Sequence, residues 1–395
     1  MLKQTVFVGL SGGVDSAVSA ALLKKQCYEV VGVFIKTWHP DFLFCNEEEE
    51  RRDAMRVAAC LDIPFLTFDF KNVYKKEVAD YMIHEYKMGR TPNPDVMCNK
   101  KVKFGAFLKK ALALGADFVA TGHYAKIMKP VKENFVRVGA RLRVKRQNFP
   151  LLAELHKNKD LSKDQSYFLW TLQQEQLKKI LFPVGHLKKT EVRKLAKKFN
   201  LPVAEKKDSQ GICFLGAVDL KEFLKHYIKE KRGKVYNVRG EEIGYHDGVF
   251  FHTLGERHGF TITQKSPNDG PYYIVGKDVK RNILIVSQDE NCLAKSTDIF
   301  LLKNSSCSRQ SRSQVSLQDN FCLCLKDTNW ISKIPEKSKA YTAQIRYHGE
   351  LLPCQIKCQT PGVGQVIFKK PVLVAAGQSC VIYDGDICLG GGVVV

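Results

Sequence analysis

The sequence predicts an α/β fold in which a doubly wound parallel sheet precedes a region of short strands that forms a small β-barrel or sandwich. Apolar strand-like runs alternate with amphipathic helical runs over the first 125 residues, which is typical of repeated βα units. From about Lys234, short strand-like runs are broken by Gly and Asp, and alternating apolar and polar residues follow. A chain of 395 residues is long enough for roughly two or three such domains.

The predicted elements of the first domain follow one another in βα order. They are a strand at 5–10, a helix from Ala17, a strand at 29–38, a helix at 47–61, a strand at 64–70, a helix at 103–115 and a strand at 116–124. Glycine or polar residues stand at three strand ends, at 9–16, 35–37 and 121–123. Because ligands bind beyond the carboxyl ends of parallel strands, we expect a site at this edge.

The stretch GLSGGVDS, residues 9–16, joins the first predicted strand to the first helix. Glycines let the backbone approach a ligand, and the unpaired N–H groups of a helix start favour an anion such as phosphate. Neither a Walker loop nor a G-x-G-x-x-G loop matches. The run does match the G-x-S-x-G of hydrolases, but a single strand before Ser11 leaves no place for their oxyanion loop. A tight turn without ligand would not require three glycines and Asp15.

Two cysteines lie in polar loops. Residues 91–101, TPNPDVMCNKK, contain two prolines that exclude a helix there, and Asp95 and Cys98 are spaced to share one face of a helical turn. The polar setting argues against a buried structural role for Cys98. Cys213 stands in a second polar loop, which follows a predicted basic helix at 190–199. Residues 160–181 read as a polar loop followed by an aromatic-rich helix.

The net charge of +21 is concentrated in one part of the chain. Residues 100–234 carry a net charge of +20, whereas residues 1–99 carry −2 and residues 235–395 carry +3. A solubilising surface would not need this concentration. The excess indicates a surface that binds a phosphate backbone.

Composition excludes several classes of protein. The sequence contains no run of some 20 apolar residues, and a strand that starts at Thr5 leaves no room for a targeting peptide, so we expect a cytoplasmic protein without membrane contact. None of the 13 cysteines forms a C-x-x-C pair, so no structural metal bound by the protein is predicted. Cys354 and Cys358, with His348 nearby, are more typical of neighbouring strands. An odd number of cysteines favours reduced thiols.

Taken together, the motifs resemble a known family. GLSGGVDS resembles the loop of PP-loop ATP pyrophosphatases. The full set is similar to the bacterial tRNA-specific 2-thiouridylases nearly end to end, through TPNPDVMCNKKVKF, ATGHYA, KDQSYFL, KDSQGICF, HTLGERHGF, QIRYHG and GDICLGGG. The resemblance implies a PP-loop ATP-binding catalytic domain with a doubly wound parallel sheet at 1–217, a small central α+β domain at 218–290 and a C-terminal β-barrel at 291–395.

The same resemblance implies 2-thiolation of the wobble uridine of tRNA, with AMP and pyrophosphate as products. Cys213 would carry a persulfide, Cys98 would be the second nucleophile, and Asp95 would be the acid/base group. A disulfide between the two cysteines would form on oxidation. The ATP-binding residues would be Gly9, Leu10, Ser11, Gly12, Gly13, Val14, Asp15, Ser16, Ile35 and Gly122. The tRNA-binding residues would be Asn93, Pro94, Asp95, His123, Lys163, Asp164, Gln165, Arg346, Tyr347 and Gln378.

The implied cofactors and partners are ATP with Mg²⁺, the lysine, glutamate and glutamine tRNAs, and an upstream persulfide sulfur-carrier protein. Ile35 stands where methionine is usual, and Glu256 stands where glutamine is common. The stretches 140–158 and 304–318 are longer than usual, and the sequence leaves open whether they contact RNA. Two other functions remain open: an adenylating synthetase for a small molecule, which would not explain the two cysteines, and a non-enzymatic RNA-binding module, which would not explain the glycine loop.

Overall fold

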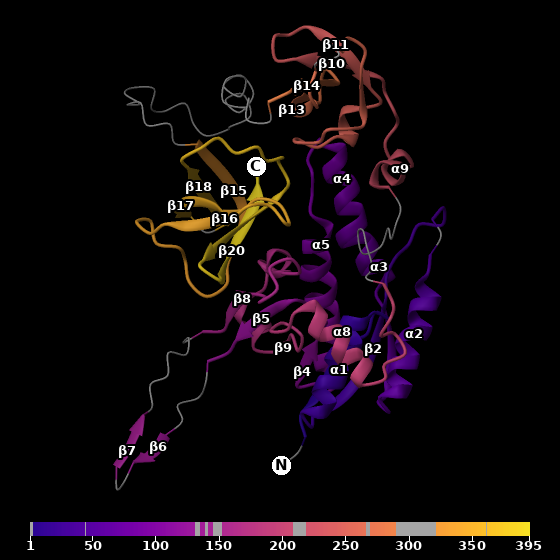
Figure 1. Ribbon diagram of the computed structural model, residues 1–395, viewed down its shortest axis with the longest axis vertical. Helices are drawn as coiled ribbons and strands as arrows, with labels where there is room; N and C mark the ends of the chain where they lie inside the picture. Colours follow the sequence, from indigo (N-terminus) through magenta and orange to yellow (C-terminus); the bar gives the residue numbers. More distant parts are fainter. Residues whose placement is uncertain are drawn as a thin grey trace.

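The computed structural model describes most of the chain, in the ranges 3–43, 45–130, 135–138, 141–144, 152–207, 219–265, 269–289, 321–360 and 362–395. Figure 1 shows a parallel-sheet domain close to the N-terminus, a small central sheet at the far end of helix α4, and a β-barrel that contains the C-terminus. The predicted fold class is confirmed. The segment 304–318 and most of 140–151 lie outside the described residues.

The first domain contains an open sheet of five parallel strands. Its order across the sheet is β3-β2-β1-β4-β9. Their bounds are Thr5–Gly9 for β1, Glu29–Lys36 for β2, Phe65–Asp69 for β3, Phe118–Ala120 for β4 and Ile180–Leu181 for β9. The strand order reverses direction between β1 and β4. A doubly wound sheet opens a crevice at such a switch point, and the glycine stretch begins there, at the end of β1.

π-Helical segments join some of the α-helices of this domain. The α-helices are α1 (Val14–Lys25), α2 (Glu47–Cys60), α3 (Lys71–Tyr74), α4 (Tyr81–Lys87), α5 (Pro94–Met97), α6 (Leu108–Ala113), α7 (Gln174–Leu177) and α8 (Lys189–Lys198). The π-helical segments are Lys75–Asp80 between α3 and α4 and Cys98–Phe107 between α5 and α6. The helix expected at 103–115 is instead a π-helical segment, Cys98–Phe107, that continues into α6. The aromatic-rich helix expected within 160–181 is a 3₁₀ turn, Ser166–Leu169, followed by α7 and β9.

Two hydrophobic clusters cover the two faces of the parallel sheet. Val6 and Val8 of β1 belong to one cluster and Phe7 belongs to the other, as the alternation of side chains along a strand requires. The cluster around Phe7 also contains the aromatic side chains of the 3₁₀ turn, Tyr167 and Trp170. Residues far apart along the chain therefore share one hydrophobic core on this face of the parallel sheet.

The remaining chain forms two β domains. The central domain has the helix α9 (Leu220–Lys225) and strands β10 (Gly233–Asn237), β11 (Glu242–His246), β12 (Phe260–Ile262), β13 (Tyr273–Asp278) and β14 (Ile283–Ser287). The barrel strands are β15 (Phe321–Trp330), β16 (Tyr341–Gln344), β17 (Leu352–Thr360), β18 (Val363–Phe368), β19 (Ser379–Asp384) and β20 (Ile387–Val394). Pairing of β15 with both β18 and β20 closes the barrel.

Strands of the first domain extend the barrel sheet, which the sequence pattern did not predict. β5 (Ala125–Met128) pairs with β8 (Glu154–Lys157), and β8 pairs with β20. Between them in the chain, β6 (Phe135–Val138) and β7 (Arg141–Val144) form a hairpin. The pairing of β8 with β20 fixes the barrel against the first domain. Among the described residues, no helix has both the length and the apolar character needed to cross a membrane.

Candidate functional site

The glycine-rich loop is organised by its own serines. The Ser16 hydroxyl donates to the carbonyl of Gly13 (3.0 Å) and accepts from the backbone N–H of Ser11 (3.2 Å). Gly12 has φ +73°, and a Cβ there would lie 2.5 Å from the carbonyl oxygen of Glu50. Glycine is therefore required at this position. The loop holds a fixed shape whose exit is the N-terminus of α1, an arrangement suited to phosphate.

The switch point brings the end of β4 against the start of α1. A Cβ on Gly122 would lie 2.7 Å from both the carbonyl carbon of Asp15 and the backbone nitrogen of Ser16. Gly122 therefore permits close packing of the two predicted ATP-binding segments. Ile35, near the end of β2, is half-buried at the same edge of the sheet.

Asp15 has two partners that the sequence pattern did not identify. Its carboxylate accepts from the Tyr124 hydroxyl at 2.6 Å and from the Lys189 ammonium at 2.8 Å to each oxygen. Lys189 is the first residue of α8, and the basic run around it contains no sequence signal that distinguishes this lysine from its neighbours. Tyr124 follows His123 directly. Both bonds to Asp15 join residues that are more than 100 positions apart in the sequence, so no local sequence pattern could identify them.

The Pro-flanked segment, residues 91–101, is helical from Pro94 onward, so the expectation that its prolines exclude a helix was wrong. The Asn93 side chain accepts from the backbone N–H of Val96 at 3.1 Å and so caps α5, whose first residue is Pro94. Asp95 is half-buried. Cys98 is 2% exposed and belongs to the hydrophobic cluster around Phe7. The argument against a buried Cys98 was therefore wrong, because its side chain packs into this core.

The predicted tRNA-binding loop Lys163-Asp164-Gln165 is held by its own side chains. Asp164 accepts from the backbone N–H of Asn158 (2.8 Å) and from the Ser166 hydroxyl (2.6 Å), and burial raises the pKa of the Asp164 carboxyl. Gln165 accepts from the backbone N–H of Tyr124 and donates its own backbone N–H to the Tyr124 carbonyl, both at 2.9 Å. The loop is thus joined through Tyr124 to Asp15. Lys163 is half-buried.

The barrel supplies the other predicted tRNA-binding residues. The centre of the Tyr347 ring lies 4.4 Å from the centre of the Phe168 ring. Burial raises the pKa of Tyr347, and the negative charges of Asp164 and Asp95 raise it further. Arg346 is exposed. The contact with Phe168 brings Tyr347 against the 3₁₀ turn of the first domain, across the domain boundary.

A second contact joins the barrel to the Pro-flanked segment. The backbone N–H of Thr91 donates to the carbonyl of Ala376 at 2.8 Å, two residues before the half-buried Gln378. A Cβ on Gly377 would lie 2.9 Å from the Thr91 carbonyl oxygen. The barrel loop and the segment that carries Asp95 and Cys98 therefore meet backbone to backbone.

His123 lies inside the domain. It is 7% exposed, its Nδ1 is 2.7 Å from the Thr121 hydroxyl, and its ring packs against Phe104 and Phe182. Burial, aided by the charge of Lys103, lowers the pKa of His123 well below 6.5. Contact of the ring with RNA would require this packing to open, and its role in tRNA binding stays a prediction.

This lowered pKa predicts that acid destabilises the protein. The unfolded chain binds a proton at His123 below about pH 6.5 and the folded chain does not, so the stability is present above that pH and is lost as the pH falls. When the pH falls from 6.5 to 5.5, we expect the free energy of unfolding to decrease by about 1 kcal/mol less in His123→Gln than in the wild type. Urea unfolding at the two pH values measures the difference, and parallel losses in both proteins would contradict it. Substitution of the exposed His258 by Gln is the control.

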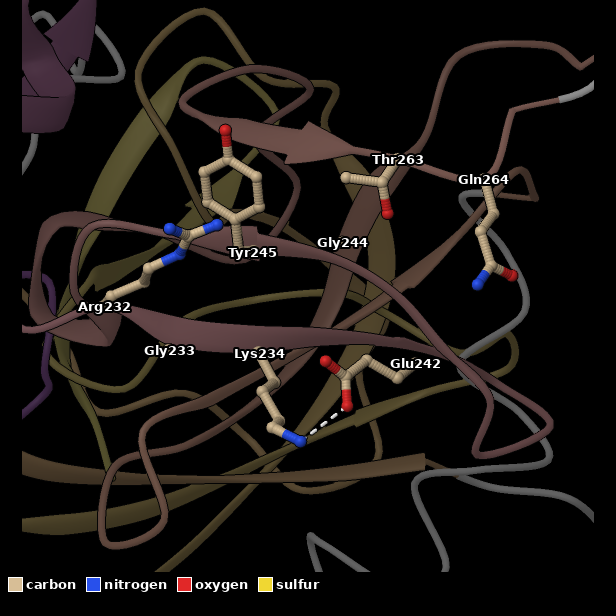
Figure 2. Close-up of a pocket in the computed structure, with 8 residues that line it drawn as sticks. All are labelled: Arg232, Gly233, Lys234, Glu242, Gly244, Tyr245, Thr263 and Gln264. Atoms are coloured by element: carbon tan, nitrogen blue, oxygen red, sulfur yellow. Dashed lines mark hydrogen bonds and ion pairs between the residues drawn. The ribbon is translucent and has the colours of Figure 1, made fainter.

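Cys213 lies outside the described residues, as does any pairing of it with Cys98. Within the ranges that the structure describes, no group of three or more His, Cys, Asp or Glu side chains is arranged to hold a metal ion. A pocket with a volume of about 550 Å³ lies on the central sheet, lined by Arg232, Gly233, Lys234, Glu242, Gly244, Tyr245, Thr263 and Gln264. Figure 2 shows the Arg232 guanidinium over the Tyr245 ring and the ion pair of Lys234 with Glu242. No predicted site residue lines this pocket.

An anion-binding glycine loop at the switch point of a parallel sheet defines a nucleotide-binding α/β domain, here joined to two β domains. The chain matches family models described as tRNA methyl transferase HUP domain (residues 4–217), tRNA methyl transferase PRC-barrel domain (221–288) and aminomethyltransferase beta-barrel domain (320–394). The tRNA-specific 2-thiouridylases of Listeria monocytogenes strain HCC23 and Geobacillus thermodenitrificans are each 41% identical to it, over 98% of this chain and 94% of theirs.

The chain belongs to the family of tRNA-specific 2-thiouridylases, which confirms the resemblance found in the sequence motifs. Among solved structures, a U34-tRNA thiolase from Methanococcus maripaludis is 16% identical, with a TM-score of 0.33 over 58% of this chain and 68% of that one. That likeness is too low to bear on function.

Proposed function

We propose that this protein forms 2-thiouridine at the wobble position of tRNA by ATP-dependent sulfur transfer. The observation that carries the proposal is the identity to tRNA-specific 2-thiouridylases over nearly the whole chain, through all three domains. The domain boundaries we propose are 1–217, 218–290 and 291–395, and the ranges of the three family models support them.

The first chemical step is adenylation of the uracil C2 carbonyl oxygen. That oxygen attacks the α-phosphorus of ATP, the bond to the bridging oxygen breaks, and pyrophosphate leaves with the electron pair. The loop at 9–16 and the N-terminus of α1 suit the binding of pyrophosphate, and the Asp15 carboxylate would be a ligand of Mg²⁺. Mg²⁺, when bound, neutralises phosphate charge. The step makes the C2 oxygen a good leaving group, as part of AMP.

The second step delivers sulfur. The terminal sulfur of a persulfide on Cys213 attacks C2 and AMP leaves. The Cys98 thiolate then attacks the Cys213 sulfur, which forms a disulfide and releases 2-thiouridine. A thiol reductant must restore the disulfide to two thiols in every cycle. Asn93, Pro94 and Asp95 would line the flipped base, with Asp95 as the acid/base group.

Several residues would hold the RNA. We propose contacts from His123, from Lys163, Asp164 and Gln165, and from Arg346, Tyr347 and Gln378. The packing of Tyr347 against Phe168 and the bond from Thr91 to Ala376 support a surface shared by the barrel and the first domain, whereas the His123 ring is buried. The family suggests the lysine, glutamate and glutamine tRNAs as substrates and a persulfide carrier protein as sulfur donor.

The basic segment 100–234 predicts tRNA binding that weakens steeply with salt. Each phosphate neutralised by Lys or Arg releases counterions, so log affinity should fall by about 0.7 to 0.9 per phosphate for each log unit of salt. Filter binding of tRNA over a range of salt concentrations measures the slope. An affinity that does not change with salt would mean that the basic segment is a solubilising surface.

The deciding experiment incubates the protein with unmodified tRNA, ATP, Mg²⁺ and a persulfide donor, and then analyses the nucleosides by mass spectrometry. We expect 2-thiouridine together with equal amounts of AMP and pyrophosphate. The family models carry methyltransferase in their descriptions, and a methylated nucleoside instead would overturn the proposal. Pyrophosphate release without tRNA would favour a synthetase for a small molecule, and tRNA binding without turnover would favour an RNA-binding module.

A further inference from the structure

Lys189 is placed on the glycine loop from a distant part of the chain. Its ammonium donates to both carboxylate oxygens of Asp15 at 2.8 Å and lies 5.7 Å from the centre of the Tyr124 ring. The two ionic residues are 174 positions apart in the sequence. Asp15 is the second residue of α1, so the ammonium lies at the helix N-terminus, where the backbone N–H groups of the loop collect.

The position of this lysine is fixed at both of its ends. The Lys189 side chain is 14% exposed, whereas Lys188, Lys194, Lys197 and Lys198 of the same region are exposed. Its backbone N–H donates to the Asp160 carboxylate at 3.1 Å, and α8 packs against α1. An ordinary surface ion pair contributes about 0 to 1 kcal/mol and does not need such an anchored cation.

The charge balance at the loop changes when a triphosphate arrives. Asp15 brings negative charge to a place where the helix N-terminus favours an anion, and Lys189 compensates it. A bound triphosphate brings more negative charge, and its bridging oxygen gains a further negative charge as pyrophosphate leaves. A cation close to that oxygen stabilises the transition state more than the ground state.

We propose that Lys189 is a catalytic residue of the adenylation step, whose ammonium moves from the Asp15 carboxylate to the β- and γ-phosphate oxygens of ATP. This assignment rests on the proposed function. In the step, the bond between the uracil oxygen and the α-phosphorus forms and the bond from that phosphorus to the bridging oxygen breaks. The N3 proton of uracil passes to Asp95, the proposed acid/base group. Lys189 stays protonated throughout and neutralises the departing pyrophosphate.

Affinity for inorganic pyrophosphate tests this role without turnover. Calorimetric titration of the full-length protein without Mg²⁺ should show that Lys189→Met binds pyrophosphate at least about tenfold more weakly, the loss expected for one charge-assisted hydrogen bond. Lys197→Met is the matched control, because it removes the same charge from the same helix at a side chain that is 63% exposed and pairs with Glu205. Its pyrophosphate affinity should stay at the wild-type value.

Kinetics supply the second readout. Lys189→Met should lower kcat for tRNA-dependent pyrophosphate release by about a hundredfold, with tRNA affinity unchanged, and Lys189→Arg should recover part of it. Equal pyrophosphate affinity in Lys189→Met and wild type would overturn the assignment. If the Met variant does not fold, the pyrophosphate affinity of Lys189→Gln supplies the same comparison with the wild type. If the wild type itself releases no pyrophosphate with tRNA, the proposed function fails, while the affinity comparison still decides the role of Lys189.

Discussion

Asp15→Asn should abolish tRNA-dependent pyrophosphate release while affinity for tRNA stays within about twofold of the wild type. The substitution keeps the shape of the side chain but removes the charge that would ligate Mg²⁺ and that holds Lys189 at 2.8 Å. Loss of such an electrostatic group costs about a hundredfold to a thousandfold in kcat. Pyrophosphate release with saturating tRNA and a parallel tRNA titration measure the two quantities.

Ser11→Ala is the comparison variant for the loop. Its hydroxyl lies 3.3 Å from that of Ser16, and the proposed chemistry forms no acyl-enzyme, so the variant should retain part of the activity. Labelling of Ser11 by a fluorophosphonate probe would contradict this reading and favour a hydrolase. Asp15→Asn with normal pyrophosphate release would remove Asp15 from the adenylation site.

Cys98→Ser and Cys213→Ser should each stop turnover, at different points. Cys213→Ser should still adenylate tRNA but accept no sulfur, because the persulfide has no carrier. Cys98→Ser should accept sulfur on Cys213 and then stall as a covalent adduct with tRNA, because no second thiol resolves it. The 2% exposure of Cys98 means that the core around it must open before this attack.

Radiolabelled sulfur separates the two roles. Each variant is loaded from a persulfide donor, and the label is located by peptide mapping. Label on Cys98 in place of Cys213 would reverse the roles, and full activity in either variant would end the relay. Cys388→Ser is a control, since that thiol is buried in the barrel and burial raises its pKa to about 12, far from the thiolate that the chemistry requires.

Local pattern was enough to predict the glycine loop and the strands around it. β1, β2 and β3 are continuous apolar runs, and Gly12 is needed where φ is +73°. The pattern also predicted α2 and α8 to within about one residue at each end. These features depend on neighbours in the sequence, which is why they could be read from it.

Features that depend on distant partners could not be read in this way. The bonds of Asp15 to Lys189 and Tyr124 and the pairing of β8 with β20 join segments far apart in the chain. The burial of Cys98 also depends on distant partners, because its side chain belongs to the hydrophobic cluster that contains Phe7, Tyr167 and Trp170.

The bonds between the 3₁₀ turn and β19 set an order of events during synthesis. The Tyr167 hydroxyl donates to the Ser379 carbonyl at 2.9 Å, and the Trp170 indole donates to the Ser379 hydroxyl at 3.1 Å, across 212 and 209 residues. A ribosome needs roughly 10 to 40 seconds to make that much chain. For that time, both donors beneath the loop that we propose contacts RNA lack their acceptors. We therefore expect a nascent chain to complete its glycine loop well before its proposed RNA-binding surface, so competence for tRNA arrives last.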